Sequence, residues 1–202
     1  MARTSRGRTL WAAGLVLLAG GTAAGTVAVT SSPSAAPPPP RPAESYGRVL
    51  PAGVQALVRI PALGARWRYP VYEGTGAAQL ARGLAHYTGT AAAGGRGNFA
   101  LAGHRSSVTG FEPFADLPDA VVPGTPILVE TASASYTYRV TATRHTTPGD
   151  DQVLDPDQGR GADPGRRLIT LTTCTPRYGS TGRFIVFGEL EPVRVRAAGP
   201  GE

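Results

Sequence analysis

Cys174 is the only cysteine in the 202-residue chain, and it follows a run of β-branched residues. An ionised thiol is a strong nucleophile, but a free cysteine titrates near about 8.5 and needs a nearby cation to ionise at neutral pH. His104 and Arg183 can supply that cation if the fold brings them close. A lone cysteine is more often a small buried apolar residue. Cys174 is instead followed by a Thr-Pro turn, which favours a reactive thiol.

The three side chains have complementary roles in acyl transfer from a peptide. Attack of a Cys174 thiolate on a peptide carbonyl gives a tetrahedral oxyanion and then a thioester, and the departing amine needs a proton. His104 is the candidate general acid, and later the base that activates an incoming amine. Arg183 keeps its proton, so it is a candidate fixed donor to the oxyanion or to the substrate backbone. On its own, a histidine at a strand end is more often a hydrogen-bonded surface residue.

These side chains need rigid elements to bring them together. Residues 168–173 are rich in β-branched side chains and predict a strand that ends at Cys174. Residues 184–187 predict a second strand, and the stretch 177–182 between them predicts a loop. If the two strands pair, Arg183 returns close to Cys174.

The remaining predicted elements are mostly short strands with little helix. A strand at 98–103 precedes His104 and follows a glycine-rich loop at 94–97. The others are strands at 55–60, 67–72, 127–131 and 136–147, of which the last two form a hairpin, a helix at 77–83, a helical turn at 111–117 stopped by Pro118, and a polar loop at 150–163. Many short strands with little helix fit a closed or nearly closed β-barrel.

Three segments resemble the sortases, cysteine transpeptidases of the Gram-positive cell surface. The run TLTTCTP at 170–176 resembles their TLxTC motif, Arg183 resembles their later arginine, and LAGHR at 101–105 resembles their histidine motif. The three pieces occur in the order of the family, which makes the combination far more specific than any one of them. The resemblance is strongest to the class E branch, the housekeeping sortases of actinobacteria, and spans roughly residues 54–190.

The resemblance implies an all-β fold, a closed eight-stranded sortase-type barrel with one or two short helices. It implies that His104, Cys174 and Arg183 are catalytic. Thr173, directly before the nucleophile, matches a family threonine and is an expected substrate contact. Tyr87 belongs to a segment that resembles the wall of the substrate groove, so it is expected to bind substrate as well.

The resemblance also implies a reaction and its partners. We expect cleavage of a C-terminal sorting signal of surface proteins between Thr and Gly, and transfer of the acyl group to an amine of a peptidoglycan precursor (lipid II). Class E similarity implies an LAxTG signal rather than LPxTG. The chemistry requires no cofactor and no metal.

Several other polar residues are expected to have no part in this chemistry. His86 and His145 lack partners in the sequence and are expected to be structural, while Arg105 and Arg177 are expected to be solvated. The five aspartates of the 150–163 loop could gather a calcium ion, but they lack EF-hand spacing, so a solvated loop is the better interpretation.

The segment before the barrel predicts export. Three arginines precede residues 10–29, which carry no charge and match the thickness of a bilayer, so residues 1–30 predict a basic flank and a membrane anchor with the rest outside the cell. A cleaved signal peptide is the alternative. Residues 31–45 contain four consecutive prolines and predict an extended linker, and residues 46–202 form the extracellular catalytic domain.

Composition and motifs weigh against other functions. All 20 basic residues are arginine, and the formal charge of +6 is scattered and partly due to the N-terminal flank, which argues against nucleic-acid binding. A cell-wall L,D-transpeptidase or other cysteine peptidase would place histidine and glycine shortly before the cysteine, where Thr172 and Thr173 stand. A non-catalytic wall-binding module would need no free thiol.

Overall fold

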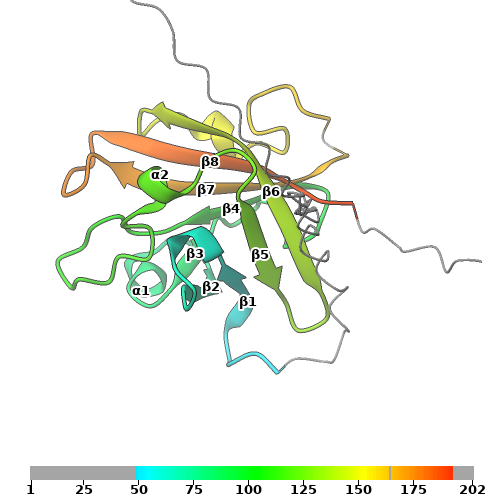
Figure 1. Cartoon of the computed structure of the whole chain (residues 1–202), viewed down its shortest axis with the longest axis horizontal. Helices are drawn as coiled ribbons and strands as arrows, with labels where there is room; N and C mark the ends of the chain where they lie inside the picture. The colour runs from blue at the N-terminus through cyan, green and yellow to red at the C-terminus, as the bar shows by residue number, and fades with distance from the viewer. Residues whose placement is uncertain (1–48, 164, 193–202) are drawn as a thin grey trace, which may run out of the picture. The chain divides into compact units, whose positions relative to one another are not determined.

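The protein's computed structural model describes residues 49–163 and 165–192 and shows one closed β-barrel (Figure 1). Its strands are β1 (Val54–Arg59), β2 (Arg68–Glu73), β3 (Leu84–His86), β4 (Gly97–Ala102), β5 (Pro126–Glu130), β6 (Ser135–Thr146), β7 (Arg167–Thr175) and β8 (Gly182–Leu190). Its short helices are α1 (Ala77–Leu80) and α2 (Leu117–Ala120), with 3-10 turns η1 (Pro61–Leu63) and η2 (Asp151–Leu154). The predicted eight-stranded barrel with one or two short helices is confirmed.

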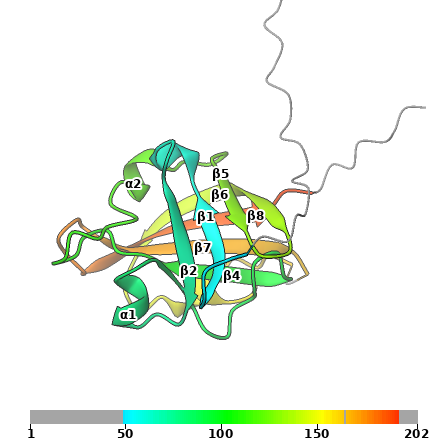
Figure 2. The ribbon, with the colours of Figure 1, turned by 90° about the horizontal axis from the view of Figure 1, so that it is seen from below.

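Around the barrel the strands follow the order β1-β2-β3-β4-β7-β8-β6-β5. The β2–β3 and β4–β7 pairs are parallel, and the other pairs are antiparallel. In both ribbon views the β7–β8 turn and α2 lie on the same side of the barrel (Figure 1, Figure 2). Closure leaves no open sheet edge for other chains to pair with.

Alternation along the strands separates the barrel interior from its outer face. Ile169 and Leu171 of β7 and Phe184 and Val186 of β8 are at most 3% exposed and belong to the central core. Because successive side chains of a strand point to opposite faces, the residues between them point outward. This places the thiol of Cys174 on the outer face.

The outer face of β4 and β7 is covered by the connection between β6 and β7. Asn98 donates from Nδ2 to the carbonyl oxygens of Val153 at 3.0 Å and Asp155 at 3.1 Å. Gln158 donates to Ile169 O at 2.9 Å and Thr170 Oγ1 at 3.1 Å. Asn98 and Gln158 are buried, so these bonds fasten the connection where water does not compete.

Three local predictions were wrong or incomplete. The expected helical turn at 111–117 is a series of turns, and the helix α2 begins at Leu117, because Pro118 sits in the first helical turn, where a missing N–H costs nothing. The helix predicted at 77–83 ends earlier, at Leu80. The three-residue strand β3 was not predicted at all.

The predicted N-terminal anchor and linker lie outside the described residues. Within residues 49–163 and 165–192, no helix is long and apolar enough to cross a membrane.

Candidate active site

The parallel pairing of β4 with β7 has one constant register. Residues Gly97–Ala102 face Arg167–Thr172 one to one. The register continues past the last ladder pair, because Gly103 N donates to Thr172 O at 3.1 Å and Thr173 Oγ1 donates to Gly103 O at 2.8 Å. Extrapolated one step further, this register pairs His104 with Cys174.

Cys174 and Arg183 meet across the other edge of β7. They are direct Cα partners in the antiparallel β7–β8 pair, so their side chains share the outer face. Cys174 is a free, half-buried thiol, and His104 and Arg183 are also half-buried. The fold therefore brings together the three residues that the sequence predicts to be catalytic, on the ends of three adjacent strands.

The guanidinium of Arg183 is held at the β7–β8 turn. Its Nη1 donates to Ser180 O at 3.2 Å and Gly182 O at 3.0 Å. Within the described parts of the chain, Nε and Nη2 donate to no protein acceptor. Arg183 can therefore direct N–H groups at a bound molecule while it stays anchored through Nη1.

A small pocket of about 50 Å³ opens beside Arg183, the partner of Cys174 across β7 and β8. Its lining includes Tyr87, Thr172, Arg183 and Ile185, together with residues from the end of β6 and from η2. The Tyr87 hydroxyl lies 3.0 Å from Thr172 Oγ1, so the two side chains form one continuous wall. Tyr87, an expected substrate contact, lines this pocket together with Arg183.

A buried histidine supports the segment that carries Tyr87. His86 Nδ1 lies 2.7 Å from Glu73 Oε2, and Nε2 lies 3.0 Å from Ala91 O and 3.0 Å from Thr90 Oγ1. These contacts hold both ring nitrogens of His86 and tie β2 to the loop after β3. The hydrogen bond from His86 lowers the pKa of Glu73.

Thr173 occupies a different position from the one expected of a substrate contact. Its side chain is buried at 3% exposure, and its hydroxyl donates to Gly103 O on the neighbouring strand. In this arrangement it fixes the backbone next to His104. Its predicted contact with substrate stays a prediction.

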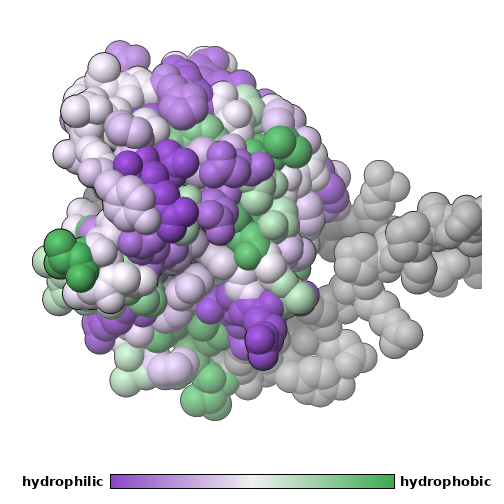
Figure 3. Space-filling view, turned by 60° about the vertical axis from the view of Figure 1, so that its left-hand side comes forward, coloured by the Kyte–Doolittle hydropathy of each residue, from purple (hydrophilic) through white to green (hydrophobic). Residues whose placement is uncertain are grey.

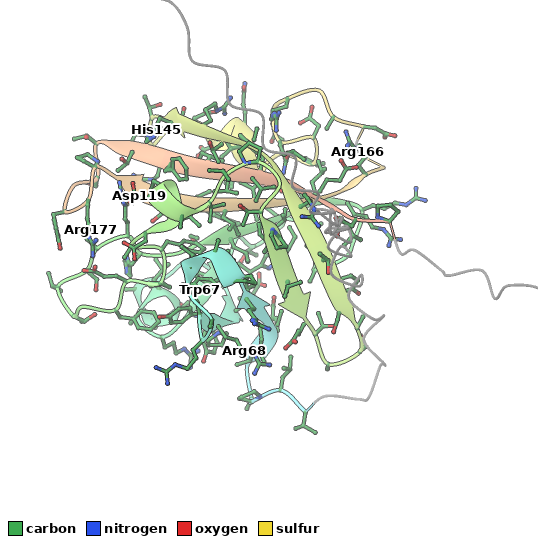
Figure 4. All side chains as sticks on the ribbon, in the orientation of Figure 1. Trp67, Arg68, Asp119, His145, Arg166 and Arg177 are labelled. Atoms are coloured by element: carbon green, nitrogen blue, oxygen red, sulfur yellow. The ribbon has the colours of Figure 1, made fainter. Side chains whose placement is uncertain are left out.

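Two loops at this side of the barrel are clamped together. Arg177 of the β7–β8 turn pairs with Glu112 at 3.0 Å and with Asp116 at 3.6 Å, and Tyr178 N donates to Ser106 Oγ at 3.1 Å. The Ser107 amide and then Arg177 lower the pKa of Glu112, and Glu112 raises the pKa of Arg177. Arg177 (labelled in Figure 4) is exposed, as expected of a solvated residue, and it also pairs with two carboxylates from a distant loop.

Arg105 was also expected to be solvated, and this was wrong. Its side chain is only 12% exposed, and it donates to Thr175 Oγ1, the residue that follows the cysteine. No local sequence pattern indicates this contact, because Thr175 lies 70 positions further along the chain.

The rest of the surface offers no comparable arrangement. A larger cavity of about 270 Å³ lies at the other end of β7 and β8, beside Leu168 and Glu189, away from Cys174. Figure 3 turns the side with the clamped loops forward and shows a mainly hydrophilic surface with separate hydrophobic patches. Among the residues that the structure describes, no three His, Cys, Asp or Glu side chains are grouped to hold a metal ion.

Known proteins share this sequence pattern. Sortase SrtE1 of Streptomyces coelicolor is 43% identical over 106 residues, which are 51% of this chain and 29% of SrtE1. Sortase SrtE2 of the same organism is 38% identical over 98 residues, 47% of this chain and 37% of SrtE2. The chain thus spans well under half the length of these curated relatives.

Solved structures share the fold. Sortase E from Streptomyces avermitilis superposes with a TM-score of 0.61 at 37% identity, covering 74% of this chain and 91% of that one. Sortase E1 from S. coelicolor, solved with a tripeptide in its active site, superposes with a TM-score of 0.62 at 36% identity, covering 69% of this chain and 88% of that one. These relatives confirm the resemblance to class E.

A sequence profile of the sortase domain matches residues 58–191. The matched segment runs from within β1 to just beyond β8, so it includes nearly the whole barrel and all three strands that meet at Cys174. Because fold and motif order agree over this length, the chain belongs to the sortase family.

Proposed function

We propose that this protein is a cysteine transpeptidase that cleaves a C-terminal sorting signal between Thr and Gly and transfers the threonyl acyl group to an amine of a cell-wall precursor. The observation that carries the proposal is the shared register of β4 and β7, which brings His104 beside Cys174, with Arg183 opposite. Family membership alone would give the reaction type. The register supplies the geometry that the reaction needs.

In the first half of the reaction the Cys174 thiolate attacks the carbonyl carbon of the threonine. The carbonyl oxygen becomes an oxyanion, and the N–H groups of Arg183 that have no protein acceptor stabilise it. The C–N bond then breaks, His104 gives a proton to the departing glycine amine, and a thioester remains on Cys174.

In the second half an amine of the peptidoglycan precursor attacks the thioester carbon. His104 takes the proton that the amine loses, the new amide bond forms, and the thiolate of Cys174 leaves. This half-reaction joins the surface protein to lipid II or a related wall precursor. Every bond that forms or breaks is accounted for by the two substrates and these side chains.

The substrate we propose is an extended peptide of the LAxTG type, in preference to LPxTG. Tyr87 and Thr172 form a continuous wall of the pocket next to Arg183, and this wall favours the binding of a peptide segment there. Sortase E1 from S. coelicolor was solved with a tripeptide in its active site, which supports peptide binding at the corresponding place. The similarity to class E supports the alanine in the signal.

We further propose that residues 10–29 anchor the protein in the cell membrane as a single span, with the barrel outside. The uncharged run behind Arg3, Arg6 and Arg8 supports this orientation. Cell fractionation and sequencing of the mature N-terminus test it. A mature protein that begins within residues 25–40 and is released into the medium would contradict the anchor.

The test of the reaction uses the full chain in detergent, matched LAxTG and LPxTG peptides, and an amine acceptor. We expect cleavage between Thr and Gly, faster for LAxTG, a thioester on Cys174 detectable by mass, and an amide product with the acceptor. Cys174→Ala removes all of these, while Arg139→Gln, on the far end of β6, keeps them. Cleavage at another bond, or cleavage that survives Cys174→Ala, contradicts the proposal.

A further inference from the structure

Arg105 is a charged side chain that is unusually well buried. It directly follows His104, at a point where the β4 ladder has ended, yet its side chain is only 12% exposed. Charged side chains are rarely buried unless they are paired and hydrogen-bonded. The contacts that compensate its burial therefore indicate what this side chain does.

These contacts reach three separate segments. Nη1 donates to Thr175 Oγ1 at 3.2 Å, Nε donates to Ala115 O at 3.4 Å, and Nη2 lies 3.7 Å from Asp119 Oδ2. Asp119 is 75% exposed (labelled in Figure 4), so solvent screens the ion pair. The bonds to Thr175 and Ala115 are the ones that define a geometry.

The bond to Thr175 continues the register of the active site. Gly103 is joined to Thr173, and Arg105 is joined to Thr175, by side-chain hydrogen bonds with the same sequence separation of 70. His104 and Cys174 lie between these two bonds. They are therefore bracketed on both sides, beyond the point where the main-chain ladder stops.

We propose that Arg105 is a positioning residue that sets the distance between the His104 imidazole and the Cys174 thiol by bridging to Thr175. The inference rests on the proposed transpeptidase function, which needs proton transfer between these groups. Both defined hydrogen bonds of Arg105 go to the protein itself, to Thr175 and Ala115, so it acts through the pair.

The planar guanidinium suits this task. Its N–H groups lie in one rigid plane and point in fixed directions, so one side chain can hold the end of β7 and the segment before α2 together. His104 O also accepts from Phe114 N at 2.9 Å, one residue before Ala115. A lysine offers a single ammonium on a flexible stem and cannot reproduce both bonds.

The kinetic test compares four full-length variants: Arg105→Gln, Arg105→Lys, Thr175→Val, and Arg139→Gln as the control. Arg139 also bonds a carboxylate and a backbone carbonyl, but far from the site. In Arg105→Gln we expect kcat to fall about 100-fold with KM nearly unchanged, as a 1 Å misplacement can cost that much. Arg105→Lys should have a kcat as low as that of Arg105→Gln. Thr175→Val should also lower kcat. The double variant Arg105→Gln/Thr175→Val should have a kcat little lower than that of Arg105→Gln alone.

A bifunctional cross-linking reagent tests the spacing of His104 and Cys174 without any peptide. 1,3-Dibromoacetone first alkylates a thiol and then bridges to a nearby imidazole, so its yield of Cys174–His104 cross-link reports their spacing. We expect the wild type and Arg139→Gln to cross-link, and Arg105→Gln and Thr175→Val to give several times less cross-link at equal alkylation of Cys174. The melting temperature of each variant is measured alongside.

The outcomes separate the two proposals. If the wild type cross-links but cleaves no sorting peptide, the transpeptidase function fails while the role of Arg105 is still decided by its variants. Cross-linking of Arg105→Gln or Thr175→Val at the wild-type yield overturns the positioning role. So does a loss of kcat no greater than the loss of folded protein.

Discussion

Cys174 and Arg183 are direct partners across the antiparallel pair β7–β8, with their side chains on the same outer face of the barrel. The pairing puts a cation beside a free thiol, and the Nε and Nη2 atoms of Arg183 donate to no acceptor among the described residues, so they are available to a bound molecule. These two roles, charge and geometry, make different predictions.

The Arg183→Lys variant separates them. Lysine keeps the positive charge, so alkylation of Cys174 by a small reagent should stay within about threefold of wild type. Turnover of a sorting peptide should fall about 100- to 1000-fold, the usual cost of losing one oxyanion donor. Steady-state kinetics and an alkylation time course on the same proteins measure both, and near-wild-type turnover would reduce Arg183 to a charge.

The Tyr87→Phe variant tests the pocket wall. It removes the hydroxyl that lies 3.0 Å from Thr172 Oγ1 but keeps the ring. A net hydrogen bond of about 1 kcal/mol corresponds to about a fivefold loss of kcat/KM, which should appear mainly in KM. Peptide kinetics with LAxTG and LPxTG signals measure it, with Tyr72→Phe as the control on β2. A kcat/KM within twofold of wild type for both peptides would mean that the Tyr87 hydroxyl takes no part in substrate binding.

The strands that carry the site could be predicted because their sequences are locally distinctive. The β-branched run at 168–173 lies inside β7, and the run at 184–187 lies inside β8. β3 could not be predicted, since three buried residues are too few to show alternation. The partners of Arg105 were equally hidden, because no local pattern indicates which residue 70 positions away will accept its hydrogen bond.

The stabilising interaction of Glu73 with His86 should be lost in acid. The His86 hydrogen bond lowers the pKa of Glu73 below its ordinary value of 4.5, so the unfolded chain takes up a proton at higher pH than the folded chain. The stability is fully present above pH 4.5 and is lost as pH falls through the lower, folded pKa. Glu73→Gln should make the melting temperature depend less on pH in this range, whereas Glu191→Gln should leave that dependence unchanged. An unchanged pH dependence in Glu73→Gln would show that Glu73 does not cause the loss of stability in acid.

Tyr138 should make the protein less stable in alkali. Burial raises the pKa of its phenol from 10.0 to about 12, so its contribution to stability is present below pH 10 and is lost as pH rises toward 12. Tyr138→Phe should remove this dependence. It should also cost about 1–3 kcal/mol at neutral pH, because Gly94 N, 2.6 Å from the hydroxyl, loses its acceptor.

Chemical denaturation at pH 7 and pH 11 measures both effects for Tyr138, with Tyr178→Phe as the control because Tyr178 is 80% exposed. An equal alkaline loss in Tyr138→Phe and wild type would mean that another group causes it.

The pairing of β4 with β7 has a consequence for how the chain acquires its activity. The two halves of the site are 70 residues apart in sequence, so they meet only after a long loop has closed, and contacts of this kind slow folding. During synthesis the thiol therefore emerges long after the histidine and stays unpaired with it until the barrel closes. A partly folded chain thus has the thiol without the geometry that the proposed reaction needs.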